Sequence, residues 1–311
     1  MLRATAEVRY QPEIYARPAQ LRAACAEADG LVVRNCTRVN AALLAAAPRL
    51  RVVGRLGSGL DNLDGDQLRI AGIEVVSAAG TNAVATAEFT LTAALLLSRR
   101  WRPEWLGPGA DWSGRTAGEG VELCGRTIGL VGLGRVGLSV ARRARALGLD
   151  VLAAAPGRSP QDVEVRDVGA ELVGLPELLR RSDIISLHAS LGPGTHRLIG
   201  RRELALARPG AVLINTARGG LLDEAALAVA LREGWLAGAA LDVRDPEPPS
   251  QPDPLDGLPG LIRTPHVAGL SREAQLQTAL QVAAGVLRVL RMPAGPATPA
   301  AGEAGVLPGT R

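Results

Sequence analysis

Short apolar runs alternate with helical patterns along most of the chain. Within the first hundred residues, β-rich runs are separated by stretches with helical spacing. The runs lie at 30–34, 51–56 and 73–76, and the helical stretches lie near 40–47 and 64–71. Such a strand–helix–strand rhythm is typical of parallel strands joined by crossover helices. The first part of the chain therefore predicts a parallel sheet.

A second strand–helix series is longer and more regular. Its predicted strands lie at 127–131, 151–154, 184–187, 211–215 and 239–243. Between the two series, an apolar helical pattern at 87–99 is followed by residues 101–120, which are rich in Gly, Pro and Trp. That composition is typical of a domain boundary. The two series thus predict two domains.

These patterns predict an α/β protein with two doubly wound parallel-sheet domains. The first part of one domain is expected at 1–95 and the second domain at 96–282. A helical pattern at 272–291 can lead the chain back, so a return helix is expected at 283–295. The final residues, 296–311, have the composition of a disordered tail.

The composition is that of a globular protein. Of 311 residues, 47% are apolar and 21% are charged. The net charge of +4 comes from arginine, since the chain has no lysine, and the arginines form no basic block. Aromatic residues make up only 2% of the chain. Nucleic-acid binding is therefore not expected.

The cysteines and the apolar runs narrow the class of protein further. Cys25, Cys36 and Cys124 are isolated, which indicates neither a disulfide framework nor a zinc site. The first ten residues contain no apolar signal region, and the longest apolar run, 91–97, is too short to cross a bilayer. We expect a cytoplasmic protein with no bound metal and no membrane partner.

A glycine-rich turn follows the first strand of the second series. Gly132, Gly134 and Gly137 are spaced as G-x-G-x-x-G, directly after an apolar strand and before a helix. The glycines permit a tight turn, close approach of a pyrophosphate and close helix packing, while helix N-terminal amides, including those of Arg135 and Val136, bind negative charge. The alternative is a glycine-rich connection in another α/β protein. Strand, turn, helix and next strand in register favour dinucleotide binding.

The next strand ends without the acidic residue that would bind an adenosine ribose hydroxyl. Ala155 stands there, and Arg158 and Ser159 follow. A guanidinium and a hydroxyl suit a 2′-phosphate, which a carboxylate would repel. This favours NADP(H) over NAD(H). The alternative is that Arg158 is a solvated loop residue and that NAD(H) binds without the acid.

Three later segments carry candidate chemistry. They are LINTARGGLLDEAAL at 213–227, AALDVRDPEPP at 239–249 and RTPHVAG at 263–269. With RLGSGLDNLD at 55–64 and GTNAVATAEFT at 80–90, they resemble the D-isomer-specific 2-hydroxyacid dehydrogenase family. The resemblance runs from about Asp29 to Arg291.

The resemblance assigns catalytic roles to Arg218, Glu247 and His266. Arg218 would hold the substrate carboxylate and carbonyl, Glu247 would pair with the histidine, and His266 would be the acid/base. The chemistry agrees, because a keto acid needs a proton on oxygen and histidine titrates near ~6.5. Arginine can also grip a planar carboxylate with two bonds. Taken singly, each residue also has a purely structural explanation.

The resemblance also implies substrate contacts. A loop after a predicted strand, at Gly57, Ser58 and Gly59, would offer backbone N–H groups to the carboxylate, and glycines there allow close approach. Asn82 would lie near the substrate cleft. The family usually opens with a strand and a helix before the equivalent of Glu7–Tyr10, so the N-terminus is expected to be shortened or to start upstream.

Further positions would lie along the cofactor. Thr216 and Asp242 correspond to groups near the nicotinamide. His188 lies in a segment that passes the cofactor, where its backbone matters more than its ring. Ser190 replaces the proline usual after that histidine, which affects only the geometry of the cofactor loop.

Together these features predict a Rossmann dinucleotide-binding domain inserted into a flavodoxin-like substrate domain. The expected function is hydride transfer between NAD(P)H and a small 2-keto or D-2-hydroxy acid. Glyoxylate or hydroxypyruvate is expected first, and a 3-phosphoglycerate or sulfolactate type second. The resemblance implies a homodimer with its contact near 87–120. The alternative function is a non-catalytic, nucleotide-sensing regulatory protein on the same fold.

Overall fold

The computed structural model describes residues 1–100 and 119–292. The predicted tail, and nearly all of the predicted boundary segment at 101–120, lie outside the described residues. The chain forms two compact units. Unit 1 contains Met1–Thr81 and the chain from Gln275 onward, and unit 2 is the continuous segment Asn82–Ala274. Unit 2 is therefore inserted into unit 1.

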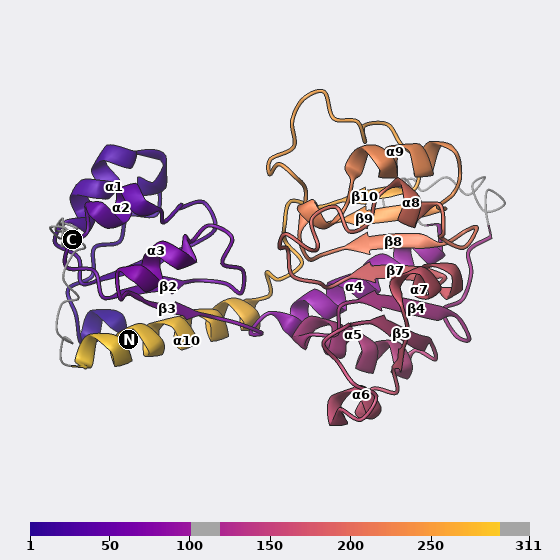
Figure 1. Ribbon diagram of the computed structural model, residues 1–311, viewed down its shortest axis with the longest axis horizontal. Coiled ribbons are helices and arrows are strands. Elements are labelled where there is room, and N and C mark those ends of the chain that lie inside the picture. Colours follow the sequence, from indigo (N-terminus) through magenta and orange to yellow (C-terminus); the bar gives the residue numbers. More distant parts are fainter. Residues whose placement is uncertain (101–118, 293–311) are drawn as a thin grey trace, which may run out of the picture. The chain divides into compact units, whose positions relative to one another are not determined.

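Unit 1 is built on a three-stranded parallel sheet, and Figure 1 labels its elements. The strands, in spatial order, are β1 (Gly30–Val33), β2 (Val52–Arg55) and β3 (Glu74–Ser77). The helices are α1 (Pro18–Cys25), α2 (Ala41–Ala45), α3 (Gly65–Ile70) and α10 (Arg272–Arg291), with short 3-10 helices at Leu2–Ala4 and Ile14–Ala16. The predicted strands and helices of this region are all present, with shifted ends.

The pleat of β2 explains why helices cover both faces of this sheet. Successive side chains of a strand point to opposite faces. Val53 packs with Leu21, Leu43 and Leu68, which lie on α1, α2 and α3. The preceding residue of β2 belongs to a second cluster, which contains α10 residues. Helices α1, α2 and α3 therefore pack on one face of the sheet, and α10 packs on the other.

Unit 2 is built on a seven-stranded sheet in which every pairing is parallel. In spatial order the strands are β10 (Leu261–Arg263), β9 (Gly238–Leu241), β8 (Val212–Asn215), β7 (Ile184–Leu187), β4 (Thr127–Val131), β5 (Asp150–Ala154) and β6 (Glu171–Leu172). The winding direction reverses between β4 and β7. In open α/β sheets, ligands bind at the carboxyl ends of strands beside such a reversal.

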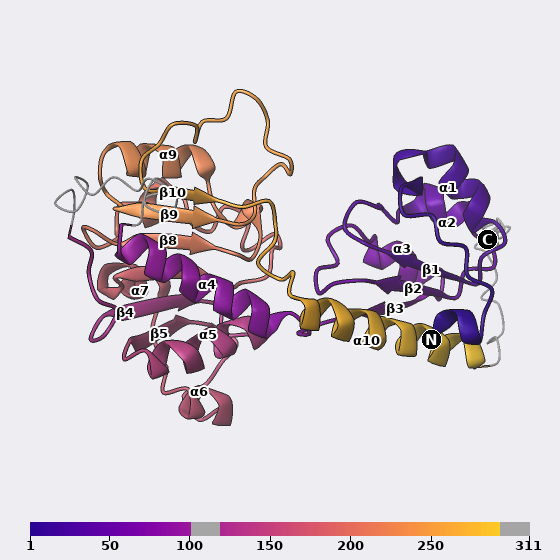
Figure 2. The same cartoon turned by 180° about the vertical axis from the view of Figure 1, so that it is seen from behind.

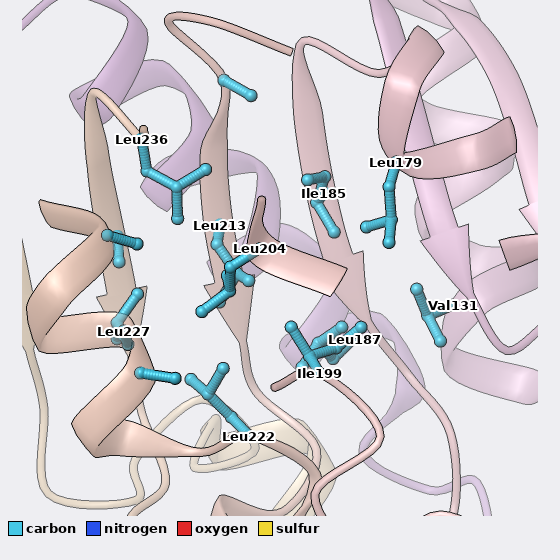
Figure 3. Packing of buried hydrophobic residues seen from close by; sticks show 14 of the residues in the cluster. Val131, Leu179, Ile185, Leu187, Ile199, Leu204, Leu213, Leu222, Leu227 and Leu236 are labelled. Atoms are coloured by element: carbon cyan, nitrogen blue, oxygen red, sulfur yellow. The ribbon is translucent and has the colours of Figure 1, made fainter. Parts of the chain in front are cut away.

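Helices cover both faces of this sheet as well. They are α4 (Ala83–Ser98), α5 (Arg135–Ala146), α6 (Val163–Asp167), α7 (Leu175–Arg181), α8 (Arg201–Leu204) and α9 (Glu224–Arg232), with a 3-10 helix at Gly219–Leu221. One apolar cluster joins the strands to α4, α5 and α6, which face the viewer in Figure 2. The other joins them to α7, α8 and α9, and Figure 3 shows Leu179, Leu204 and Leu227 packed against strand residues.

The unit boundaries differ from the boundaries expected from the sequence. The expected changes were at 95/96 and 282/283, but the units divide after Thr81 and before Gln275. The reason is packing. Leu91 and Ala94 of α4 lie in the same cluster as Ile128 and Leu130 of β4, so α4 belongs to unit 2. The described residues contain no helix long and apolar enough to span a bilayer.

Candidate active site

Three neighbouring strands of unit 2 lead into the predicted catalytic residues. Arg218 follows β8, Glu247 follows β9, and His266 follows β10. Because β8, β9 and β10 are adjacent and parallel, their carboxyl ends lie at one edge of the sheet. Residues that are far apart in the sequence therefore reach the same edge.

The structure brings Glu247 and His266 into direct contact. Nδ1 of His266 lies 2.9 Å from Oε2 of Glu247, and the two side chains are 43% and 35% exposed. A ring nitrogen bonded to a carboxylate carries the proton, so Nε2 is the atom that can exchange a proton with a substrate. This geometry is the one that a general acid/base and its orienting carboxylate require, and the catalytic role of the pair stays a prediction.

The charges around His266 favour its protonated form. The hydrogen bond to Glu247 raises the pKa of His266, burial opposes this, the charge of Asp242 adds to it, and the charge of Arg218 works against it. Burial acts to raise the pKa of Glu247, but hydrogen bonds from His266 and from the Arg244 backbone outweigh it and lower that pKa. The pair therefore exists as carboxylate and imidazolium over a wider pH range than isolated groups would.

The backbone around His266 is held by Asp242. His266 has a φ of 56°, and its backbone N–H donates to the Asp242 carbonyl at 2.8 Å. The buried Asp242 carboxylate accepts from Thr264 Oγ1 at 2.6 Å and from the N–H groups of Val267 and Ala268 at 2.8 Å each. Asp242 shapes the loop that presents His266, and its predicted contact with a nicotinamide stays a prediction.

A buried asparagine shapes the turn that carries Arg218. Asn215, at the end of β8, donates from Nδ2 to the Arg218 carbonyl at 2.8 Å and accepts from the Ala217 N–H at 3.1 Å. The Arg218 charge acts to lower the pKa values of both His266 and Glu247, and Nη1 of Arg218 donates to the Ala217 carbonyl at 2.6 Å. Asn215 was not among the predicted site residues, although it precedes the T-A-R-G segment directly.

The glycine turn after β4 has the geometry that its spacing predicts. Gly132 has a φ of 100°, and a Cβ there would lie 2.8 Å from the backbone of His188 and Ala189. A Cβ on Gly137 would lie 2.5 Å from the Gly132 carbonyl oxygen. At Gly134, by contrast, no protein atom lies within 4 Å of such a Cβ. The turn is thus closed by protein on two sides and open at Gly134, which fits a pyrophosphate.

The remaining predicted cofactor residues lie near this turn or along the sheet edge. Arg135 and Val136 form the first turn of α5, and their N–H groups are at its N-terminus. Burial lowers the pKa of His188 to about 4, and its Nε2 lies 2.9 Å from the Ser186 hydroxyl, so the ring is neutral. Thr216 contacts Thr90 through their hydroxyls at 3.2 Å.

Arg158 lies beside the glycine turn, but it is already engaged. Its Nε donates to the Leu133 carbonyl at 3.2 Å, while Nη1 pairs with Glu164 at 2.7 Å and approaches Asp162 at 3.6 Å. The Ser159 hydroxyl bonds to Gln161. Arg158 is thus close enough to contact a group bound at the glycine turn. The carboxylates of Glu164 and Asp162 balance its positive charge.

The predicted substrate residues fall in different units. Gly57, Ser58 and Gly59 follow β2 in unit 1, and Gly57 has a φ of 147°. The Arg55 side chain occupies the space beside Gly57, and its Nη1 donates to the Leu56 carbonyl at 2.7 Å. Arg55 was not predicted as a site residue.

Asn82 lies in unit 2, directly before α4. A Cβ on Gly269 would lie 2.7 Å from Nδ2 of Asn82. Gly269 follows His266 by three residues, so the Asn82 side chain packs against the loop that carries the histidine. Across the described residues, no group of three or more His, Cys, Asp or Glu side chains is placed to hold a metal ion.

A Rossmann sheet with an open glycine turn and a carboxylate–histidine pair defines a dinucleotide-dependent oxidoreductase. The model of the D-isomer specific 2-hydroxyacid dehydrogenase NAD binding domain matches residues 94–268. The (S)-sulfolactate dehydrogenase of Chromohalobacter salexigens is 44% identical over 259 residues, which cover 82% of each chain. The chain belongs to the D-isomer-specific 2-hydroxyacid dehydrogenase family.

Two further relatives agree with this assignment. The D-3-phosphoglycerate dehydrogenase of Archaeoglobus fulgidus is 39% identical over 85% of this chain, which spans only 50% of that longer protein. The crystal structure of a glyoxylate reductase from Paecilomyes thermophila has a TM-score of 0.80 and 31% identity over 88% of this chain and 85% of that one. The predicted family, fold class and hydroxy-acid oxidoreductase function are confirmed, and a nicotinamide dinucleotide is supported as cofactor.

Proposed function

We propose that this chain is an active dehydrogenase that uses NADPH to reduce a 2-keto acid to a D-2-hydroxy acid. The observation that carries the proposal is the 2.9 Å contact between His266 Nδ1 and Glu247 Oε2. A protein that only sensed a nucleotide would need the glycine turn but not an imidazole whose pKa is raised by a carboxylate. The pair therefore supports an active enzyme rather than a nucleotide sensor.

Each side chain has a distinct task in the proposed reaction. A bound reduced nicotinamide supplies the hydride to the keto carbon. Arg218 holds the substrate carboxylate and polarises the keto oxygen, since a guanidinium offers parallel N–H donors. His266 gives the proton on Nε2 to that oxygen, and Glu247 keeps the ring oriented and stabilises its charged form. In the oxidation direction, neutral His266 takes the proton back.

The proposed preference for NADP(H) rests on the residues beyond β5. Ala155 offers no carboxylate to a ribose hydroxyl, and Arg158 already reaches the carbonyl of Leu133 within the glycine turn. A 2′-phosphate would compete with Glu164 and Asp162 for the Arg158 guanidinium. A phosphate carries more charge than either carboxylate, so we propose that Arg158 changes partner when NADPH binds.

For the substrate, we propose a 2-keto acid with a second anionic group, a sulfonate or a phosphate, ahead of glyoxylate or hydroxypyruvate. Two of the relatives reported above are a sulfolactate dehydrogenase and a phosphoglycerate dehydrogenase, whose substrates carry such groups. In addition, Arg55 places a cation beside the Gly57–Gly59 loop that is predicted to bind the substrate carboxylate. A guanidinium at this loop can form charge-assisted hydrogen bonds to a second anion on the substrate.

A substrate panel tests the proposal. Reduced-cofactor absorbance is followed with sulfopyruvate, 3-phosphohydroxypyruvate, hydroxypyruvate and glyoxylate, each with NADPH and with NADH. The expected result is turnover, fastest with a doubly anionic substrate and NADPH. Cofactor binding without turnover of any 2-keto acid would contradict the proposal and favour a nucleotide-sensing protein.

We also propose that the protein is a homodimer that uses the region near 87–120, of which 101–118 lie outside the described residues. Leu95 of α4 is a large apolar side chain that is 44% exposed. Light scattering of the full chain is expected to give twice the mass of 32.2 kDa. A mass of one chain at micromolar concentration would refute the dimer.

A further inference from the structure

A buried ion cluster in unit 2 lies beside the acid–base pair. The Arg244 guanidinium lies between two carboxylates. It donates to both oxygens of Glu224 at 2.9 and 2.8 Å, and to both oxygens of Asp253 at 2.9 Å each. The side chains of Arg244, Glu224 and Asp253 are only 8%, 14% and 2% exposed. Water therefore screens these charges little.

Arg244 connects this cluster to Glu247 through its backbone. The Arg244 N–H donates to Oε1 of Glu247 at 2.9 Å, and the other oxygen of Glu247 binds His266. The neighbouring Asp245 N–H also donates to Glu224, at 3.2 Å. The position of the Glu247 carboxylate thus depends on where the cluster holds the Arg244 backbone.

The cluster also reaches the segments of the other two catalytic residues. A Cβ on Gly219, the residue after Arg218, would collide with the Arg244 carbonyl, so these two backbones are in close contact. Asp253 accepts from Nη1 of Arg263 at 3.1 Å. Arg263 is the last residue of β10 and precedes His266 by three residues. One buried cluster therefore touches the supports of Arg218, Glu247 and His266.

We propose that Arg244, held by Glu224 and Asp253, is a positioning residue that sets the geometry of the Glu247–His266 pair. Only an arginine can serve, because its planar fork makes paired bonds to two carboxylates at once. A lysine in its place would keep the charge but could not align both carboxylates, so the backbone that orients Glu247 would move. The kinetic consequence rests on the proposed function, whereas the geometry does not.

The test measures the ring of His266 directly. The chain has only three histidines, so NMR of the full chain resolves their ring signals, and His266→Gln identifies the one that belongs to His266. The groups that act on this ring are Glu247, Asp242 and Arg218, and the bond to Glu247 has the largest effect and raises its pKa. In Arg244→Lys, the His266 pKa is expected to fall toward its ordinary value.

The matched control is Arg181→Lys. Arg181 also bonds two carboxylates, those of Glu171 and Glu177, but it lies on the exposed surface of the same unit. Its substitution is expected to leave the His266 titration unchanged. An unchanged His266 pKa in a folded Arg244→Lys variant would overturn the proposal and leave the cluster a purely stabilising one.

Two more variants keep the test decisive if Arg244→Lys does not fold. Glu224→Gln keeps the shape of one partner. Arg263→Gln removes the link from Asp253 to β10, together with the ion pair to the exposed Asp256, through a side chain that is 40% exposed. At least one of them is expected to lower the His266 pKa, and no change in either would refute the proposal. In Arg244→Lys, kcat for a substrate that the wild type reduces is expected to fall roughly tenfold to hundredfold, while cofactor affinity is kept.

If the wild type reduces none of the 2-keto acids, the proposed function fails, and the NMR titration still decides the role of Arg244. If the wild type is active and Arg244→Lys loses stability without any change in the His266 pKa or in kcat, only the positioning role fails.

Discussion

The sheet of unit 2 carries two sites along one edge, and they are built in opposite ways. At the end of β4, the cofactor turn is backbone, shaped by Gly132, Gly134 and Gly137, which have no side chains. At the ends of β8, β9 and β10, the candidate chemistry belongs to charged side chains held by hydrogen-bonding and charged partners. A site made of backbone depends on the space that its glycines leave for a ligand. A site made of charged side chains depends on the groups that hold those side chains in place.

The two histidines at this edge sharpen the comparison. His188 lies beside the glycine turn, where burial lowers its pKa to about 4 and keeps it neutral. The bond from Glu247 raises the pKa of His266. One residue type thus has its pKa lowered at the first site and raised at the second, and we propose that only the second acts as an acid. The carboxylate partner makes the difference.

The largest expected effect comes from His266→Gln. Without a group that donates the proton, kcat for keto-acid reduction is expected to fall by roughly 10² to 10⁴-fold. Cofactor affinity is expected to be unchanged, because the glycine turn is a separate site. The matched control is His196→Gln, at an exposed histidine outside the site. Stopped-flow kinetics and cofactor titration check both, and a fully active His266→Gln would refute the acid role.

Alanine variants at two glycines distinguish a glycine that packs against protein from one that leaves room for the cofactor. In Gly137→Ala, the new Cβ would meet the Gly132 carbonyl oxygen at 2.5 Å, so unfolding free energy is expected to fall by about 1–3 kcal/mol. In Gly134→Ala, no protein atom is near, so the melting temperature is expected to hold while cofactor affinity falls about tenfold. Equal melting temperatures and equal affinities in the two variants would contradict the proposed turn.

Smaller effects are expected at Arg158. Arg158→Ala removes a charged hydrogen-bond donor. It is expected to weaken NADPH binding by about tenfold and to leave NADH binding unchanged. Glu164→Gln removes the nearer of the two competing carboxylates and is expected to strengthen NADPH binding a few-fold. The ratio of kcat/KM for the two cofactors checks both. The proposed preference for NADPH would be refuted if the wild type prefers NADH and Arg158→Ala keeps that preference unchanged.

Local sequence patterns predicted the backbone site more completely than the charged one. The glycine spacing predicts the turn because Gly132 and Gly137 meet a local steric demand of the backbone, while Gly134 leaves the turn open. The ends of strands 127–131 and 184–187 agree with β4 and β7, since both are buried on both faces. The unit boundary was misplaced because α4 packs by long-range contacts that a helical pattern does not reveal.

The catalytic residues were predicted from segments that resemble a family, but their supports were not. Asn215 acts on the Ala217 and Arg218 backbone through hydrogen bonds of its side chain, and Arg244 and Asp253 pair only in the folded chain. Arg244 and Glu224 are 20 residues apart in the sequence. No local pattern distinguishes such an arginine from the many exposed ones in an arginine-rich chain.

The central claim is that Glu247 makes His266 a stronger base than an isolated imidazole, so that the ring carries the proton for reduction. The pH profile of kcat/KM for 2-keto-acid reduction tests it most directly, in the wild type and in Glu247→Gln. The wild type is expected to be fully active at low pH and to lose activity as pH rises through a pKa above ~6.5, the ordinary histidine value. In Glu247→Gln, this loss is expected at lower pH. An identical midpoint in both proteins would contradict the account.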